Sequence, residues 1–275
     1  QALSKETLAL PIFLGVEEEG GKNSVIASRS PLDVENLDDT SVIGATGDAT
    51  KAYEAAAVVG TYLQELGFNL DLAPVADVLT NDANTELTGR SFGSDSTLVS
   101  DMAVSALQGL KDKNIYGVVK HFPGLGATAG TSEEGVVSTN KTLEELMACE
   151  LVPFQKAIEA GTSFMMGGHI SVPNITGNNI PRSLSAYMIS QVLRTDMGYK
   201  GIVITDAMNQ KAITDTYSSS EAAIAAINAG ADMILMPADF KAAYQGVLEA
   251  VQNGVISEER INTSLVRIVK VKLGM

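Results

Sequence analysis

Six short apolar runs alternate with longer amphipathic stretches along the chain, and this alternation restricts the fold more than any other sequence feature. The runs show near-continuous hydrophobicity, which is typical of parallel strands buried on both faces. They are Leu10–Glu17, Asn69–Val78, Tyr116–Phe122, Ser163–Ile170, Gly201–Asp206 and Asp232–Met236. Repeated strand–helix units without a break in composition predict a single α/β domain with a parallel sheet over residues 1–275.

The stretches between the runs carry the start and stop signals of helices. Thr142 stands three residues before Glu145, as in a capping box, and Gly67, Gly161 and Gly230 stand where helices often end. The expected helices are Ala49–Leu66, Thr97–Lys113, Leu143–Ala160, Ser185–Met197, Glu221–Ala229, Asp239–Asn253 and Ser257–Leu273.

A doubly wound sheet and a barrel both fit repeated strand–helix units. The turn after the first run reads Gly-Gly-Lys-Asn-Ser at 20–24, which matches neither the G-x-G-x-x-G fingerprint nor a P-loop. Polar residues instead stand at the C-terminal ends of the runs, where a barrel builds its active site. We therefore expect a TIM-type (β/α) barrel. The polar residues are Glu17–Glu19, Asp77, Lys120, His121, His169 and Asp206.

Composition excludes several classes of function. The 275 residues carry 19 Lys and Arg against 33 Asp and Glu, a net charge of −14, which argues against a nucleic-acid partner. One cysteine gives no disulfide framework, and two histidines nearly exclude a His- or Cys-rich zinc site. Since about 18 consecutive apolar residues occur nowhere, we expect no transmembrane segment.

Each polar position taken alone has a structural and a functional interpretation. Asp206 could attack the anomeric carbon of a sugar, or it could cap the segment that follows it. Lys120 and His121 are adjacent on a strand, so both can reach one ligand only through a kink or a cis bond; otherwise one is an ion-paired Lys and the other a core His. Arg90 could clamp a ligand or pair with carboxylates. Glu17–Glu19 could be solvated or could point a carboxylate into the barrel mouth.

Five motifs in series nevertheless resemble the N-terminal barrel domain of glycoside hydrolase family 3. The similarity covers essentially the whole chain and is closest to the single-domain β-N-acetylhexosaminidases of the peptidoglycan-recycling type. The motifs are LGVEEEGG at 14–21, LAPVADV at 72–78, GRSFGSD at 89–95, KHFPG at 120–124 and ITDAM at 204–208.

The resemblance implies a role for each matching residue. Asp206 matches the catalytic nucleophile of a retaining mechanism, which passes through a glycosyl–Asp206 ester and needs no metal or organic cofactor. Glu17 stands where the family usually has a sugar-binding Asp. The expected substrate-binding residues are Glu17, Arg90, Lys120, His121, His169 and Met208, of which Arg90, Lys120 and His121 hold the −1 sugar. The expected partner is a small carbohydrate or glycan.

The acid/base is where the chain departs from the family pattern. K-H-F-P-G is usually followed by H-G-D-T and then D-S-H, whose His and Asp form the proton-donating pair. Here the Asp position holds Ala127 and the His position holds Glu133, while Val25 replaces a usual Arg. We expect Glu133 to act as a replacement acid/base, with Glu134 as the alternative. Without compensation the loss would cost about 10²–10⁴-fold in rate.

Three functional hypotheses follow from the resemblance. The first is a retaining exo-β-glycosidase, a β-N-acetylhexosaminidase acting on N-acetylglucosaminides or cell-wall fragments with an atypical acid/base. The others are a catalytically impaired sugar-binding barrel and a β-glucosidase-like hydrolase. Relatives occur in the cytoplasm and outside it, and we favour an extracellular or cell-envelope location in a bacterium.

The number of strands is too small for a closed barrel. Six βα units are visible where closure needs eight, and the resemblance begins at what would be the third strand, Leu10–Glu17. We therefore expect a barrel that lacks its first one or two βα units. An open parallel edge exposes unpaired backbone groups, so we also expect self-association through that edge.

Overall fold

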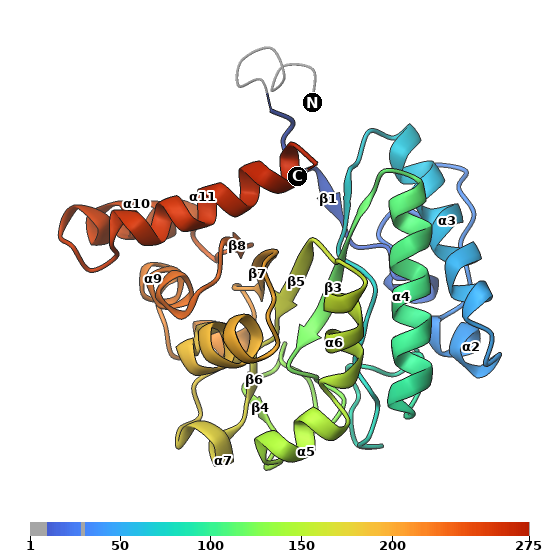
Figure 1. The fold of residues 1–275 in the computed structure, drawn as a ribbon, viewed down its shortest axis with the longest axis horizontal. Helices are drawn as coiled ribbons and strands as arrows, with labels where there is room; N and C mark the ends of the chain where they lie inside the picture. The colour runs from blue at the N-terminus through green and yellow to red at the C-terminus, as the bar shows by residue number, and fades with distance from the viewer. Residues whose placement is uncertain (1–9, 29–30, 275) are drawn as a thin grey trace.

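A curled sheet of six parallel strands forms the centre of the computed structural model, which describes residues 10–28 and 31–274 (Figure 1). The strand order is β1-β2-β3-β5-β7-β8, and every neighbouring pair is parallel. Each strand coincides with one of the six apolar runs, apart from one residue of β7 beyond its run, and the parallel α/β architecture is confirmed. The strands are β1 (Gly15–Val16), β2 (Leu70–Asp71), β3 (Tyr116–Phe122), β5 (Phe164–Gly167), β7 (Ile202–Ala207) and β8 (Met233–Leu235).

The sheet curls as a half-barrel, and in the described part of the chain β1 and β8 are its two edges. The absence of one or two βα units stays a prediction. Within the same residues, no helix is both long and apolar enough to cross a membrane.

Several strands are shorter than the apolar runs that predict them. Regular pairing of β2 ends at Asp71, and after the cis Ala73–Pro74 bond the chain returns to β3 through a single bridge between Val75 and Lys120. Pro74 has no N–H to donate to a ladder, so it interrupts the pairing. The run at 163–170 is also divided, because β6 (Ile170–Ser171) leaves the main sheet and pairs with β4 (Val137–Ser138).

Helices cover the outer face of the sheet. Figure 1 shows α3 (Ala49–Glu65), α4 (Ser96–Asp112) and α6 (Val152–Glu159) side by side, and α9 (Ser219–Ala229) packs against α10 (Phe240–Gln252). The remaining helical segments are η1 (Gly21–Asn23), α2 (Thr40–Ala45), α5 (Leu143–Ala148), α7 (Pro173–Thr176), η2 (Arg182–Leu184), the π-helix η3 (Tyr187–Asp196), α8 (Lys211–Thr214) and α11 (Glu258–Lys272).

The single helix expected over Leu143–Ala160 is in fact two helices, α5 and α6. Thr142 and Glu145 form the predicted capping box, but Cys149 leaves the helical region at φ −140° and ψ −76°. Pro153 explains the break, because in one continuous helix it would remove the hydrogen bond to Cys149 and clash with that carbonyl. Pro153 instead stands in the first turn of α6, where a missing N–H costs nothing.

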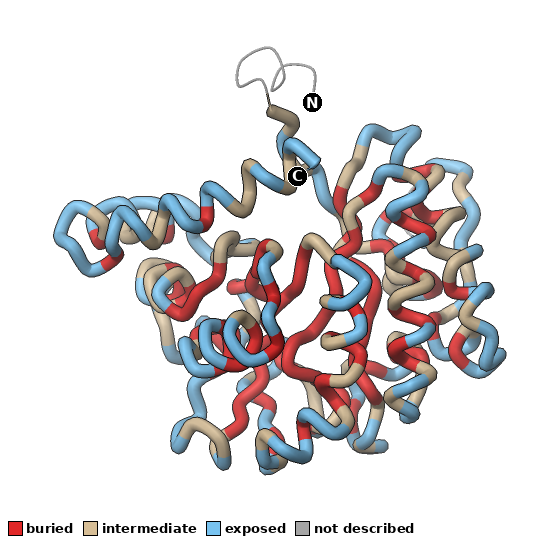
Figure 2. Tube along the Cα trace, in the orientation of Figure 1, coloured by how far each residue is buried: buried red, intermediate tan, exposed pale blue. Residues whose placement is uncertain are grey.

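An aromatic cluster closes the N-terminal end of the sheet. The rings of Phe13 and Phe164 are 5.0 Å apart edge to face, and Tyr116 packs against both. The end of α11 lies over this cluster, with Lys272 Nζ 4.9 Å from the Phe13 ring and the Tyr116 hydroxyl donating to the Val271 carbonyl at 2.8 Å. Figure 2 shows the inner strands β2, β3, β5 and β7 almost entirely buried. The opposite, C-terminal ends of the strands are therefore the ones that carry polar chemistry.

Candidate active site

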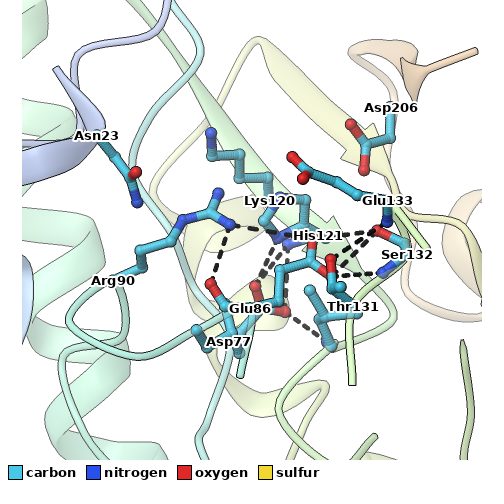
Figure 3. A network of polar contacts seen from close by, with 12 residues as sticks. Asn23, Asp77, Glu86, Arg90, Lys120, His121, Thr131, Ser132, Glu133 and Asp206 are labelled. Carbon is cyan, nitrogen blue, oxygen red and sulfur yellow. Dashed lines mark hydrogen bonds and ion pairs between the residues drawn. The ribbon is translucent and has the colours of Figure 1, made fainter. Parts of the chain in front are cut away.

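Most of the predicted polar residues come together at the C-terminal ends of β1, β2, β3 and β7, with β5 between β3 and β7 (Figure 3). Glu17 follows β1 and Asp77 lies beyond β2, whereas Lys120 and His121 are on β3 and Asp206 is on β7. Arg90 reaches the same place from the loop before α4, where it pairs with residues that follow β1.

Lys120 is the buried centre of an ion-pair network. Its Nζ lies 2.5 Å from Glu17 Oε1 and 2.6 Å from Glu19 Oε1, and its side chain is 1% exposed. Arg90 holds Glu19 in a bidentate pair, with Nε 2.8 Å from Oε2 and Nη2 2.7 Å from Oε1. Planar pairing of this kind fixes the direction of both side chains. The network therefore presents two positioned cations at the end of the sheet.

These contacts keep the network ionised. Burial alone would raise the pKa of Glu19, but Lys120 and Arg90 hold that pKa well below its ordinary value. Burial alone would lower the pKa of Lys120, and Glu19 and Glu17 raise it instead. Each group is thus charged because its partners are charged.

The three consecutive glutamates divide between the two sides of the chain. Glu17 and Glu19 face the cations, whereas Glu18 turns away and its Oε1 accepts from the backbone N–H of Ile26 at 2.6 Å. This alternation follows from extended backbone, in which successive side chains point in opposite directions. Two of the three carboxylates therefore face the site, and the Glu17 side chain remains 41% exposed.

The peptide bond between Lys120 and His121 is cis, one of the two arrangements predicted to let both side chains reach one site. His121 Nδ1 lies 2.7 Å from Asp77 Oδ2, and Asp77 also accepts from the backbone N–H of Leu125 at 2.6 Å. Burial alone would lower the pKa of His121, but the Asp77 carboxylate outweighs burial and raises that pKa. Asp77 therefore favours the protonated form of the buried His121.

Asp206 ends the apolar strand β7 and is 7% exposed. Its Oδ1 accepts from its neighbour's backbone, Ala207 N–H at 2.7 Å, and from Gln210 Nε2 at 3.3 Å. Burial alone would raise the pKa of Asp206, but His169 and His121 hold it below its ordinary value. The carboxyl is thus ionised, as attack on an electrophilic carbon requires.

His169 and Met208 both make hydrogen bonds to the backbone near the end of β7. His169 is buried, with Nδ1 2.8 Å from Ser183 Oγ and Nε2 3.0 Å from the Ala207 carbonyl, and burial lowers its pKa. Met208 is 3% exposed, lies in the main hydrophobic core, and donates its N–H to the Leu235 carbonyl. Both residues therefore fix the backbone beside Asp206, and Met208 does not face the polar cluster.

Glu133 lies on the loop after β3, at the position where the resemblance predicts a proton-donating His. Its side chain is exposed, and it lines a polar cleft of about 380 Å³ together with Arg90 and Asn23. In the view of Figure 3, Glu133 extends from this loop into the space between Lys120 and Asp206. The predicted acid Glu133 and Arg90, predicted to hold the sugar, thus line one cleft.

Sequence reasoning missed three members of the site. Glu19 was one of three adjacent glutamates, and only the alternation of side chains along an extended segment could have singled it out. Asp77 was noted as a strand-end residue without a partner. Glu86 gave one weak signal, because it stands four residues before Arg90, and the two side chains lie 3.9 Å apart. Among the described residues, no group of three or more His, Cys, Asp or Glu side chains could hold a metal ion.

Comparison with known proteins gives the family. The family model described as "Glycosyl hydrolase family 3 N terminal domain" matches residues 1–271. The chain belongs to glycosyl hydrolase family 3. The family resemblance that was predicted from five short motifs is therefore confirmed.

Relatives and solved structures agree with this assignment. Beta-hexosaminidase A of Pseudoalteromonas piscicida is 29% identical over 96% of this chain and 47% of that protein. Beta-hexosaminidase LpqI of Mycobacterium tuberculosis is 32% identical over 96% of this chain and 68% of that protein. A family 3 beta-N-acetylglucosaminidase from Paenibacillus sp. FPU-7 superposes with a TM-score of 0.91 at 35% identity, over 99% of this chain and 52% of that chain. The family 3 domain thus spans about half of two of these proteins and two thirds of the third.

Proposed function

We propose that this family 3 domain is the catalytic barrel of a retaining exo-β-glycosidase that acts on β-N-acetylhexosaminides, N-acetylglucosaminides or cell-wall fragments. One observation carries the proposal: Asp206 is a buried, ionised carboxylate at the same strand ends as the fixed cations Lys120 and Arg90. The names of the relatives, beta-hexosaminidase and beta-N-acetylglucosaminidase, support the sugar class.

The proposed mechanism gives each group a step. Lys120 and Arg90 donate hydrogen bonds to hydroxyl groups of the terminal sugar, and the Glu17 carboxylate accepts from them. Asp206 then attacks the anomeric carbon through an oxocarbenium-like transition state, and the bond to the leaving oxygen breaks. Water later attacks the same carbon and releases Asp206, so the configuration is retained. The ionised Asp206 also stabilises the positive charge that develops on the sugar ring.

Protonation of the leaving oxygen falls to Glu133 in this scheme. Glu133 lines the cleft, gives the proton in the first half-reaction and takes one from water in the second. Ala127 stands where the usual pair has its Asp, so the hydrogen bond that orients the proton donor is lost. We therefore propose slower turnover than in relatives with the His/Asp pair, most evident on substrates with poor leaving groups.

A sugar-binding barrel with little turnover is the second candidate. The replacement of both acid/base residues, by Ala127 and Glu133, favours it, because sugar binding needs only the cation network. A β-glucosidase-like hydrolase would use the same nucleophile and differ in the sugar that it accepts.

Covalent trapping tests the proposal directly. An activated 2-fluoro glycoside should add one sugar mass to the protein, and peptide mapping should place it on Asp206. Asp206→Asn should abolish both trapping and hydrolysis of aryl N-acetylglucosaminides, whereas the exposed control Asp215→Asn should retain them. Binding of N-acetylglucosamine without turnover of any aryl glycoside would refute the enzyme and leave the sugar-binding barrel.

A further inference from the structure

The residue before Glu133 is held from two sides. Ser132 is 1% exposed, although Glu133 and Glu134 after it are exposed. Its N–H donates to Glu86 Oε2 at 2.8 Å, and its Oγ lies 3.1 Å from each oxygen of the Glu86 carboxylate. On the other side its carbonyl accepts from the N–H of Ala212, in the helix α8 that follows the Asp206 strand. Ser132 therefore links the Glu133 loop to two other parts of the site.

Glu86 connects this loop to the sugar-holding arginine. Arg90 Nη1 donates to the Glu86 backbone carbonyl at 3.3 Å and lies 3.9 Å from its Oε1. The Glu86 side chain is only 8% exposed, and Figure 3 shows it between Arg90 and Ser132. One carboxylate thus touches both Arg90 and the segment that carries Glu133.

Further hydrogen bonds join the loop that carries Glu86 to the loop that carries Glu133. Asn84 Nδ2 donates to the carbonyl of Leu125 at 2.9 Å and to that of Thr128 at 3.2 Å. The Gly126 carbonyl accepts from the backbone N–H groups of Thr80 and Asn81. The contact between Glu86 and Ser132 is where this interface reaches the cleft.

We propose that Glu86 is a positioning residue for the acid/base: by holding Ser132 it fixes the place of Glu133 relative to a sugar bound at Arg90. The inference rests on the proposed function, in which Glu133 protonates the leaving oxygen. Proton transfer requires the donor within hydrogen-bond reach of that oxygen. A shift of about 1 Å in such a group can cost about 10²-fold in rate.

Dependence on the leaving group separates this role from a structural one. The experiment compares kcat and KM of wild type, Glu86→Ala, Glu86→Gln and Glu133→Gln on a dinitrophenyl and on an alkyl N-acetylglucosaminide. Glu86→Ala and Glu133→Gln should each lower kcat/KM, which reports the first half-reaction, about 10²-fold on the alkyl substrate while changing it only a few-fold on the dinitrophenyl substrate, whose leaving group needs no proton. Glu86→Gln retains an acceptor oxygen for the Ser132 N–H and should recover most of the loss.

Controls and contrary outcomes are defined by the same measurements. Glu144→Gln, an exposed carboxylate on α5, should match wild type on both substrates. If Glu86→Ala does not fold, Ser132→Ala removes only the hydroxyl contact and should show the same selective loss at smaller size. An equal loss on both substrates would assign Glu86 to Arg90 alone and overturn the inference. A folded Glu86→Ala without loss, beside an impaired Glu133→Gln, would overturn it and leave the proposed function standing. If wild type neither turns over substrate nor is trapped at Asp206, both fall together.

Discussion

Lys120 is a buried ammonium that shares both of its carboxylate partners with Arg90. Such a cluster is stable only as a whole, because removing one member leaves an uncompensated charge in a poorly solvated place. Buried charge pairs of this kind gain little stability over apolar side chains of the same volume.

Replacement of Lys120 by Met should therefore be costly. The variant leaves Glu19 buried with Arg90 as its remaining cation, and we expect the free energy of unfolding to fall by about 3–5 kcal/mol. Urea denaturation followed by circular dichroism measures this change. The exposed control Lys22→Met should stay within about 0.5 kcal/mol of wild type. A Lys120→Met variant as stable as wild type would mean that Glu19 is neutralised in the fold.

The His121–Asp77 pair predicts a pH-dependent contribution to stability. Asp77 raises the pKa of His121 above its unfolded value of about 6.5, so the folded state binds the proton more tightly. The contribution is complete below that unfolded value and is lost as the pH rises through the folded pKa. The stability difference between wild type and Asp77→Asn should therefore shrink from pH 6 to pH 9. Denaturant midpoints across this range measure it, and a constant difference would show that His121 is neutral throughout.

Sequence reasoning located the strand-end residues but could not assign their contacts. Asp206, Lys120 and His121 stand where short apolar runs end, and the succession of the runs was enough to bring them together. The pairing of Asp77 with His121, and of Glu19 with Arg90, depends on side-chain directions across strands far apart in the chain. No periodicity within one segment encodes such directions.

Among the helices, the first turn of α9 tests whether a capping sequence stabilises the helix that it begins. Ser218 accepts from the Glu221 N–H, and the Glu221 carboxylate accepts from the Ser218 N–H, which completes a capping box. Ser218→Ala should lower the free energy of unfolding by about 1 kcal/mol, since the Glu221 N–H loses its ordered acceptor. Thermal unfolding monitored by circular dichroism is a suitable measurement. An unchanged midpoint would show that water replaces the cap at no cost.

Helix periodicity predicted where helices lie better than how they are wound or divided. The segment over Tyr187–Asp196 is helical as expected, but it is a π-helix, a winding that apolar spacing did not predict. The break between α5 and α6 was readable from Pro153, because that residue cannot continue a helix that begins at Leu143. Apolar residues at helical spacing on both sides of the break nevertheless predicted one continuous helix.

At the scale of the whole molecule, the half-barrel has two open edges, and self-association through them remains a prediction. Near the β8 edge, α10 exposes Phe240 and Tyr244, which are 70% and 63% exposed and stack on each other. We expect light scattering to show a mass that rises with concentration. Added salt should favour association, because it screens the net charge of −14.

The variant Phe240→Ser with Tyr244→Ser should weaken this association. Val42→Ser on α2, another exposed apolar position, serves as the control and should leave association unchanged. A monomeric mass at every concentration and salt level would rule out the open edges as association surfaces. The strands of the main sheet lie in chain order, as successive βα units usually do. Whether a sheet closes depends on strand number and tilt, which a single chain segment does not encode.

The contact between α11 and the base of the sheet has a consequence for biosynthesis. The Tyr116 hydroxyl meets the Val271 carbonyl across 155 residues of sequence. Contacts of such separation slow folding, because a long loop must be ordered before they form. On the ribosome, β1, β2 and β3 would be complete long before the helix that covers Phe13 and Tyr116 emerges. The nascent chain therefore exposes these aromatic side chains until α11 is synthesised. Binding of a chaperone there would cover them until that helix packs.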